Sequence, residues 1–291
     1  AREKPDIVYV WGNDEAMSMM LLKPFHRFRL INGSVRHGIR SRRFSHYLRT
    51  LVLHVSRNIV ANSRAGLKAN HLRRGEVLYN GVDGRFLEYP SDRTVLRQRL
   101  TGLPADLPVM ISVANLVPYK DYFSVLKALK RLRENGHAFF YLILGEGPMR
   151  ESISQTISRY GLDSMVRILG NVERVDRYLK VSDLFIHSSR GEGCSNAILE
   201  AMACGLPVIA SDTGGTSEIV ASDNGALFPY KNDLRLFVQL IWLLQNPGLR
   251  QEMGLRSRQK VLEQFSMDRM MHQYYGILNK IHNHSYEKKH V

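Results

Sequence analysis

S-S-R-G-E-G-C-S-N-A-I-L-E-A-M-A-C-G-L-P-V-I-A-S-D-T-G-G-T-S-E-I-V, from Ser188 to Val220, is the stretch that decides the fold. Residues 184–188 are apolar enough for a buried parallel strand, and residues 208–211 form a second such run. Between them, a Gly-containing turn over residues 190–195 leads into a predicted helix over residues 196–203, which a glycine and a proline terminate. The order strand, turn, helix, strand predicts a parallel α/β sheet.

Two carboxylates bracket the start of the predicted helix. Glu192 lies in the turn before it, and Glu200 lies two turns after Glu192, within the helix. The first N–H groups of a helix lack partners within it, and its N-terminus carries a partial positive charge of about half a unit. Such an end attracts an anion, and neighbouring carboxylates can accept hydroxyl groups. The arrangement therefore suits a sugar joined to a phosphate, and a diphosphate would fit.

Composition is that of a globular protein: 291 residues, of which 44% are hydrophobic and 23% charged. This length is enough for one large core or two moderate ones. The sequence shows no apolar run long enough to span a bilayer and no apolar leader at its start, so we expect a cytoplasmic protein. Cys194 and Cys204 are predicted to be free thiols of a reducing compartment, and no metal site is expected.

The formal charge of +14 is concentrated towards the start of the chain, where residues 1–90 hold 16 Lys and Arg against 7 acids. Such a pattern suits anionic lipid head groups, a phosphorylated acceptor or nucleic acid, and a merely solvated basic surface is the alternative. Aromatic residues do not interleave with the bases as an RNA-stacking surface requires, so no nucleic-acid partner is expected. The densest cluster consists of Arg36, His37, Arg40, Arg42 and Arg43.

Short apolar runs alternate with helical patterns along the chain, which predicts parallel sheets with right-handed crossovers. A polar, turn-rich piece over residues 80–108 separates two such units. Ligands of open α/β sheets bind at the carboxyl ends of the strands. The predicted strands cover residues 7–11, 28–32, 59–63, 77–80, 109–113, 139–144, 166–169, 184–188, 208–211 and 226–228.

Four segments together resemble the retaining GT-B glycosyltransferases of family 4, also called glycosyl transferases group 1. They are S-V-A-N-L-V-P-Y-K at 112–120, L-G-E-G-P at 144–148, G-N-V at 170–172, and the element E-x7-E with the residues after it. The resemblance extends over residues 58–282. It implies two Rossmann-like domains that face a cleft, with a nucleotide sugar held mainly by the C-terminal domain and without a metal or cofactor.

The resemblance also implies a domain organisation. Residues 1–90 are expected to form the acceptor-side N-terminal domain, and residues 106–264 the nucleotide-sugar domain. Residues 265–291 are expected to form a helix that crosses back to the N-terminal domain, followed by a polar tail. The opening P-D-I-V-Y-V resembles about the fourth strand of the family's N-terminal domain, so we expect that domain to be incomplete.

Three residues match the family's main site positions. Lys120 matches the basic residue that contacts the donor phosphates, and its charge would offset the leaving diphosphate. Glu192 matches the carboxylate that faces the transferred sugar, and Glu200 matches the one that binds the ribose hydroxyls. The weaker alternatives are that Lys120 is a solvent-facing loop lysine and that Glu192 is an acid that caps a helix.

Further positions follow from the same resemblance. Gly193, Cys194 and Ser195 would offer backbone N–H groups to sugar and phosphate oxygens. Asn171 and Val172 fall where the family lines its base pocket.

Two positions depart from the family pattern. Asn115 stands where the family usually has an arginine that accompanies the phosphate-binding lysine, and Arg190 is a candidate replacement. Asn32 occupies the expected place of an important histidine, with His37 five residues later. We expect the loop from Asn32 to His37 to face the cleft on the acceptor side.

The sequence thus predicts a retaining glycosyltransferase that moves a hexose or related sugar from a UDP- or GDP-sugar to a hydroxyl of a glycan or lipid-linked acceptor. The expected location is the cytoplasm, with peripheral association with the inner face of the membrane. The missing strands and Asn115 favour one alternative, a non-catalytic or fragmentary nucleotide-sugar-binding subunit. A glycoside hydrolase would leave the phosphate features unused, and a nucleic-acid-binding protein would need neither glutamate.

Overall fold

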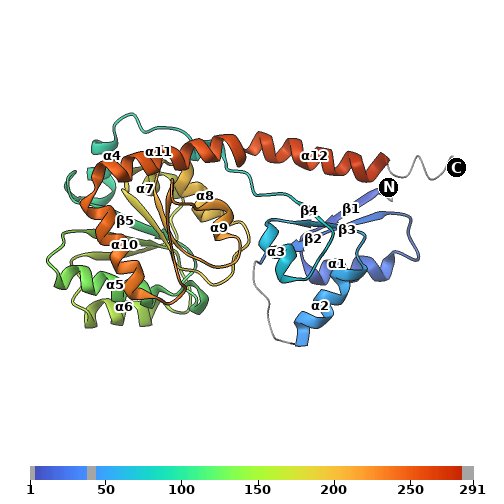
Figure 1. The fold of residues 1–291 in the computed structure, drawn as a ribbon, viewed down its shortest axis with the longest axis horizontal. Helices are drawn as coiled ribbons and strands as arrows, with labels where there is room; N and C mark the ends of the chain where they lie inside the picture. Colours follow the sequence, from blue (N-terminus) through green and yellow to red (C-terminus); the bar gives the residue numbers. More distant parts are fainter. Residues whose placement is uncertain (1–3, 38–43, 284–291) are drawn as a thin grey trace. The chain divides into compact units, whose positions relative to one another are not determined.

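The computed structural model describes residues 4–37 and 44–283, with the side chains of residues 44–49 left out. Contacts divide the chain into two compact units. Unit 1 comprises Ala1–Gly81, Gly191–Cys194 and Met267–Val291, and unit 2 comprises Val82–Arg190 and Ser195–Ser266. Each unit contains a parallel sheet flanked by helices (Figure 1). The predicted α/β fold with two Rossmann-like domains is confirmed, while the domain bounds drawn from the sequence remain a prediction.

Unit 2 contains a six-stranded parallel sheet with the order β10-β9-β8-β5-β6-β7. Its strands are β5 (Val109–Val113), β6 (Phe140–Leu144), β7 (Val166–Gly170), β8 (Leu184–His187), β9 (Val208–Ser211) and β10 (Gly225–Phe228). The chain builds β5, β6 and β7 outward on one side and then returns to add β8 next to β5. The strand order therefore reverses between β5 and β8, and loops that leave this point bind ligands in sheets of this kind.

Helices cover both faces of the unit 2 sheet, as Figure 1 shows. One face carries α5 (Tyr122–Glu134), α6 (Arg150–Arg159) and α10 (Asp233–Gln245); the other carries α7 (Val175–Val181), α8 (Asn196–Ala203) and α11 (Pro247–Gln264). The short helix α9 (Thr216–Ile219) follows β9. The central strands β5, β6, β8 and β9 are buried on both faces, which explains why they are continuous apolar runs in the sequence.

The piece predicted as a polar boundary, residues 80–108, contains structure that the sequence pattern did not indicate. A 3-10 turn, η1 (Gly84–Phe86), is followed by helix α4 (Arg93–Thr101). Asp92 caps this helix by accepting hydrogen bonds from the N–H groups of Thr94 and Val95, and Gly102 ends it with φ +70°. The helix is mostly polar, so only its two end signals could have predicted it.

Helix α4 is fastened to unit 2 by a buried ion pair. The Arg97 side chain is 1% exposed and lies 3.0 Å from Asp183 Oδ2, while Arg93 lies 2.6 Å from the other carboxylate oxygen. Asp183 also accepts a hydrogen bond from the N–H of Val109, the first residue of β5. One carboxylate thus joins α4, the start of β5 and the start of β8.

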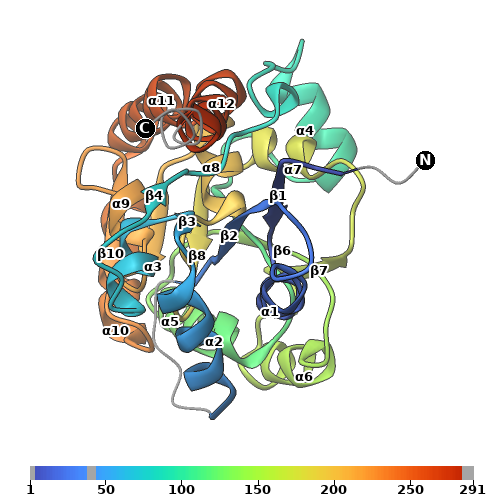
Figure 2. The ribbon, with the colours of Figure 1, turned by 90° about the vertical axis from the view of Figure 1, so that its right-hand side faces the viewer.

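Unit 1 contains a four-stranded parallel sheet in the order β1-β2-β3-β4. Its elements are β1 (Ile7–Val10), α1 (Asn13–Leu22), β2 (Arg29–Val35), α2 (Phe44–Val55), β3 (Asn58–Ala61), α3 (Arg64–Ala69), β4 (Glu76–Val77) and α12 (Met267–Asn283). Helices α1 and α2 lie on one face of the sheet and α12 on the other, as Figures 1 and 2 show. Successive side chains of β2 point to opposite faces of the sheet: Leu30 packs with α1, and Ile31 packs with α12.

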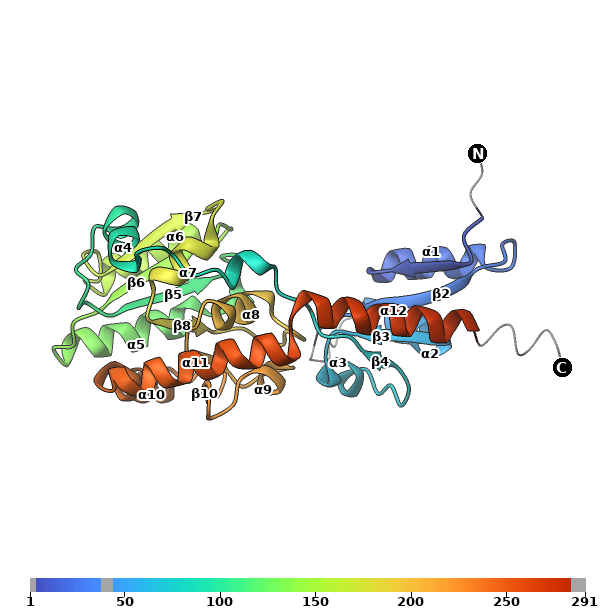
Figure 3. The ribbon, with the colours of Figure 1, turned by 90° about the horizontal axis from the view of Figure 1, so that it is seen from above.

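Helix α12 runs across the sheet of unit 1 beside β3 (Figure 3). Met270, Tyr274 and Ile277 pack against Ile31 and Val60, so the apolar side chains of this helix serve the core of unit 1. The polar tail after this helix, residues 284–291, lies outside the described residues. Among the helices that the structure describes, none is long and apolar enough to cross a membrane.

Strand β2 extends further than the sequence predicted. The expectation was a strand to Asn32 and then a loop to His37, but β2 continues to Val35. Gly33 looks like a turn residue, yet it lies within the strand because the ring of Tyr9 occupies the space of its side chain. A Cβ at Gly33 would lie 2.8 Å from Tyr9 Oη.

Candidate functional site

The loops after β5 and β8 are joined to each other at the point where the strand order reverses. Ser188 Oγ donates a hydrogen bond to the Lys120 carbonyl oxygen at 2.7 Å, and the N–H of Arg190 donates to the Tyr119 carbonyl at 2.9 Å. These bonds fix the 3-10 turn η2 (Pro118–Lys120) beside the end of β8. The side chain of Lys120 is thereby held at the carboxyl end of the sheet.

The loop after β6 packs backbone against backbone on the loop after β5. Gly145 has φ +142°, and a Cβ there would lie 2.0 Å from the Ala114 carbonyl oxygen. Gly147 has φ +156°, and its Cβ would lie 2.5 Å from the Leu116 carbonyl oxygen. Only glycine suits both positions, so the L-G-E-G-P segment serves to bring the two loops together.

The loop after β9 completes this edge. Ser211 Oγ donates to the Ser189 carbonyl oxygen at 2.6 Å and accepts from the Ser189 N–H at 2.9 Å. Thr213 Oγ1 donates to the same carbonyl at 2.7 Å. Three consecutive strand ends, β5, β8 and β9, are thus connected by hydrogen bonds, which gives the site a rigid base.

Lys120 is a partly buried cation at this edge. Burial lowers its pKa from 10.5 to about 8, because the charged ammonium loses water contacts. The buried imidazole of His187, at the end of β8, has a pKa well below 6.5 because of its own burial and the Lys120 charge. An anion bound beside Lys120 would restore the pKa of the ammonium, and this makes the residue a suitable partner for a phosphate.

Helix α8 begins next to these loops with its first N–H groups uncapped by a side chain. Ser195 is the N-cap residue, and its hydroxyl makes no capping hydrogen bond. The helix has eight residues and is buried on the sheet side through Ile198, Leu199 and Met202. The predicted anion-attracting end is therefore present, on the same loop as Ser188 and Arg190.

Glu200 lies about one turn into α8 and is half-buried. Burial raises its pKa from 4.5 to about 7, with a smaller opposing effect from Arg85 and a smaller reinforcing one from Asp83. Its carboxylate makes no hydrogen bond or ion pair with any residue in 4–37 or 44–283. A half-buried carboxylate without a partner is costly in a protein interior, and bound hydroxyl groups would satisfy it.

Glu192 belongs by its contacts to unit 1. The segment Gly191–Cys194 forms an antiparallel bridge between Glu192 and His37, and the N–H of Gly193 donates to the Arg36 carbonyl oxygen at 3.1 Å. Asn80 Nδ2 donates to the Cys194 carbonyl oxygen at 3.0 Å. The Gly193 N–H is therefore engaged within unit 1, although the sequence had assigned it to a sugar or phosphate oxygen.

The acceptor-side expectations need one correction. Asn32 is fully buried within β2; its Nδ2 donates to Ser56 Oγ at 3.0 Å, and its Oδ1 accepts from Ser34 Oγ at 2.7 Å. It supports the strand and does not face an open surface. His37 is exposed and lies beside Glu192. Arg40, Arg42 and Arg43 lie outside the described residues.

The remaining predicted residues lie on the carboxyl edge of unit 2. Asn115 is exposed directly after β5, and Asn171 and Val172 follow β7 after Gly170, which has φ +73°.

Cys194 and Cys204 are both free thiols, as predicted, and burial raises the pKa of Cys204 to about 12. The Cys204 thiol is therefore not suited to act as a nucleophile.

Sequence reasoning missed two groups near this edge. Arg85 of η1 lowers the pKa of Glu200, and Asp83, the N-cap residue of η1, raises it, but their N-G-V-D-G-R-F context indicated only a linker. Burial raises the pKa of Tyr230, which follows β10; the charge of Asp121 raises it further and that of Arg190 opposes the shift. The signal for Tyr230 was its position after a strand, because strand ends in a parallel sheet meet at one edge.

Comparisons with known proteins agree with this geometry. The family described as "Glycosyl transferases group 1" matches residues 97–260. The N-acetyl-alpha-D-glucosaminyl L-malate synthase of Bacillus anthracis is 28% identical over 84% of this chain and 61% of its own length. A Corynebacterium glutamicum protein named GDP-mannose-dependent monoacylated alpha-(1-6)-phosphatidylinositol monomannoside mannosyltransferase is 31% identical over 67% of this chain and 53% of its own. The chain thus spans less than two thirds of these relatives.

Solved structures share the fold. Anabaena Alr3699/HepE, with a structure in complex with UDP-glucose, superposes with a TM-score of 0.85 at 22% identity, over 94% of this chain and 79% of that one. The sucrose-phosphate synthase of Thermosynechococcus elongatus superposes with a TM-score of 0.84 at 18% identity, over 96% and 74%. At these identities the likeness concerns the GT-B fold alone.

Proposed function

Because the chain belongs to the glycosyl transferases group 1 family, we propose that it moves a hexose or related sugar from a nucleoside diphosphate sugar to an acceptor hydroxyl, with retained configuration as in family 4. The observation that carries this proposal is that unit 2 contains two residues whose side chains suit the two parts of such a donor. Lys120, a partly desolvated cation, and Glu200, an unpartnered half-buried carboxylate, both belong to the loop-and-helix system at the carboxyl edge of its sheet.

The diphosphate of the donor would bind between Lys120 and the N-terminus of α8. The ammonium and the first N–H groups of the helix both favour negative charge, and neither has to move when charge grows on the leaving group. Arg190 follows on the same loop and is a candidate for the charge that Asn115 does not supply. Asn171 and Val172 would contact the base.

The ribose would bind at Glu200. Two vicinal hydroxyls can donate to the two oxygens of a carboxylate, provided that the carboxylate is ionised. Binding in that form would lower the pKa of Glu200 from about 7, because the hydrogen bonds favour the charged state. The proposal therefore assigns Glu200 to donor binding and not to proton transfer.

The reaction we propose breaks the bond between the anomeric carbon and the diphosphate oxygen and forms a bond to the acceptor oxygen on the same face. The acceptor proton passes to a leaving-group oxygen, so no protein base is required. Lys120 and the α8 N-terminus stabilise the departing diphosphate. Glu192 would accept sugar hydroxyls and offset positive charge at the anomeric carbon.

The donor base and the acceptor belong to the same proposal. The neighbour from Anabaena was solved with UDP-glucose, and the Corynebacterium relative is named as GDP-mannose-dependent, so UDP- and GDP-sugars are the two donors to test. The basic excess in residues 1–90 supports a glycan or lipid-linked acceptor at the inner face of a membrane, with the protein cytoplasmic and peripheral.

Titration calorimetry of the chain with UDP, GDP, ADP and their sugars tests the donor site. We expect one nucleotide to bind, with Glu200→Gln weakening it at least tenfold and Glu134→Gln, an exposed helix position, leaving it unchanged. Failure of every nucleotide to bind would overturn the donor site.

Turnover is tested separately by release of nucleoside diphosphate in the presence of acceptor candidates. Donor binding without release from any acceptor would favour the non-catalytic subunit. Release that Glu192→Ala abolishes while donor binding persists would establish the transferase.

A further inference from the structure

A pocket of about 670 Å³ opens in unit 1 at the amino ends of its strands. Arg29, Asn58 and Glu76 are the first residues of β2, β3 and β4, and all three line it. Ligands of open α/β sheets bind at the opposite, carboxyl ends. The pocket is therefore distinct from the site to which the donor was assigned, and the proposed sugar transfer does not use it.

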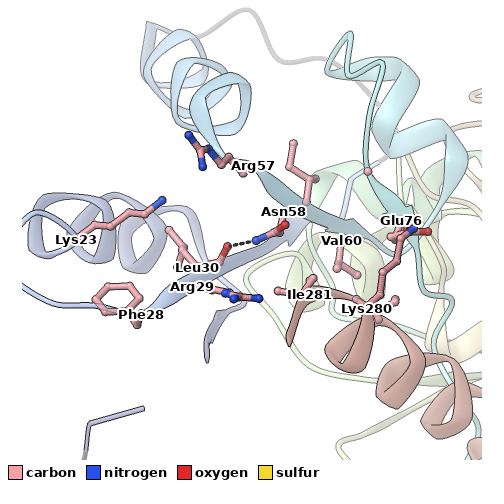
Figure 4. Close-up of a pocket in the computed structure, with 13 residues that line it drawn as sticks. Lys23, Phe28, Arg29, Leu30, Arg57, Asn58, Val60, Glu76, Lys280 and Ile281 are labelled. Carbon is pink, nitrogen blue, oxygen red and sulfur yellow. Dashed lines mark hydrogen bonds and ion pairs between the residues drawn. The ribbon is translucent and has the colours of Figure 1, made fainter. Parts of the chain in front are cut away.

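Positive charge is in excess around this pocket. Four cations, Lys23, Arg29, Arg57 and Lys280, line it together with one carboxylate, Glu76. Figure 4 shows Lys23 and Arg57 on one side of the pocket, the Arg29 guanidinium pointing towards α12, and Lys280 beside Glu76. Lys280 Nζ lies 2.5 Å from Glu76 Oε1, so the only acid among the described lining residues is already neutralised.

The other three cations retain donors for a ligand. Arg29 donates one N–H to the His282 carbonyl oxygen at 3.1 Å, which leaves further N–H groups of its guanidinium. The side chains of Lys23 and Arg57 make no hydrogen bond or ion pair with any part of the chain that the structure describes. An anion with several acceptor oxygens would satisfy these groups.

Apolar side chains surround the same opening. Inside, Leu30, Val60, Ile277 and Ile281 line the pocket. Close to two of the lining cations in the sequence, Phe25 is 81% exposed two residues after Lys23, and Val55 is 58% exposed two residues before Arg57. Exposed apolar residues next to cations are typical of surfaces that contact a bilayer, where the former enter the interface and the latter bind head groups.

We propose that this pocket binds the phosphate of an anionic phospholipid. Lys23, Arg29 and Arg57 contact the phosphate oxygens, the apolar lining contacts the start of the acyl chains, and Phe25 and Val55 enter the interface. The inference deepens the membrane association proposed above and rests on it, but it does not depend on sugar transfer. It gives that association a defined site in place of a diffuse basic surface.

Co-sedimentation with vesicles tests the site. The 291-residue chain is mixed with phosphatidylcholine vesicles that contain about a third phosphatidylglycerol, at about 0.1 M salt. We expect binding that the double variant Lys23→Gln/Arg57→Gln weakens about tenfold or more. The matched control, Lys68→Gln/Arg256→Gln, removes the same charge at exposed positions outside the pocket and should bind nearly as well as the parent.

Two competition experiments distinguish binding of a lipid phosphate from binding of free inorganic phosphate. A soluble short-chain phosphatidate should displace the protein from vesicles, whereas inorganic phosphate at the same concentration should not. Equal weakening in both double variants, equal binding to pure phosphatidylcholine, or no binding to any vesicle would each overturn the proposal. Displacement by inorganic phosphate would contradict the lipid and indicate a free-anion site. Nucleotide binding, measured on each variant, reports on unit 2 and keeps a failure here distinct from a failure of the donor site.

Discussion

At the scale of single residues, the two central side chains of unit 2 owe their properties to burial. Lys120 and Glu200 have pKa values shifted in opposite directions, to about 8 and about 7, and in both cases burial is the main cause. The window in which both are charged is therefore narrow and lies between these two values. A protein that binds an anion next to a ribose needs both charges together.

Donor affinity is consequently expected to depend on pH in a bell shape. Below about pH 7 Glu200 takes up a proton and loses acceptor capacity, and above about pH 8 Lys120 loses its charge. Affinity for a nucleotide sugar should be highest between the two values and fall by up to about tenfold per pH unit outside them. Calorimetry across the range measures this profile. Glu200→Gln should remove the acid limb and Lys120→Met the alkaline limb; a flat profile for the parent chain would contradict the assignment.

Gly145 offers a test of the loop packing. Alanine there would place its Cβ 2.0 Å from the Ala114 carbonyl oxygen at φ +142°, so the loops after β5 and β6 would have to separate. We expect a loss of about 1–3 kcal/mol in the free energy of unfolding of unit 2, together with weaker donor binding. Urea unfolding measures the first effect. Gly248→Ala, at an open helical position, should change stability by about 0.5 kcal/mol or less; an equal effect of the two substitutions would speak against the packing argument.

At the scale of elements, the sequence predicted the buried strands well but did not predict helices α1 and α4. Val109–Val113 and Val208–Ser211 were predicted with the bounds that the structure shows, because strands buried on both faces are continuous apolar runs. Helix α1 was missed because its exposed face also carries apolar residues, Met17 and Leu21, which obscure the helical period. The contact of Glu192 with His37 joins distant parts of the chain, and no local pattern encodes it.

The ion pair that holds α4 can be tested at Asp183. Replacement by alanine leaves the Arg97 guanidinium buried without its carboxylate and removes the acceptor of the Val109 N–H. We expect a loss of about 3–5 kcal/mol in the free energy of unfolding, measured by urea denaturation. Glu134→Ala, which breaks the exposed pair with Lys130, should cost no more than about 1 kcal/mol. A comparable cost for both substitutions would show that the buried pair is no more important than a surface one.

At the scale of the whole molecule, the units do not follow the order of the sequence. Unit 1 is assembled from three separate segments, and α12, the last of them, covers the sheet face formed by Ile31, Val60 and Leu78. The proposed donor residues Lys120, Asn171 and Glu200 all belong to unit 2. Stability and donor binding should therefore respond differently to truncation.

A chain that ends at residue 266 lacks α12 and exposes the apolar face of the unit 1 sheet, at a cost of about 1.5–3 kcal/mol for each large side chain uncovered. We expect strands β1 to β4 to lose protection in hydrogen-exchange mass spectrometry, while β5 to β10 keep it. A chain that ends at residue 283 should retain both. Full protection of β1 to β4 without α12 would show that the sheet is stable on its own.

The three-part assembly of unit 1 also bears on how such a gene can recombine. A single crossover at the Gly81–Val82 junction would join the first strands of one parent to the α12 of another, and two apolar surfaces that had never been selected together would have to fit. Exchange of the whole unit requires Gly191–Cys194 and α12 to travel with the first segment. Unit 2 can be inherited in one block from Val82 to Ser266 that carries only Gly191–Cys194 of unit 1 with it, whereas unit 1 cannot be inherited as a single block.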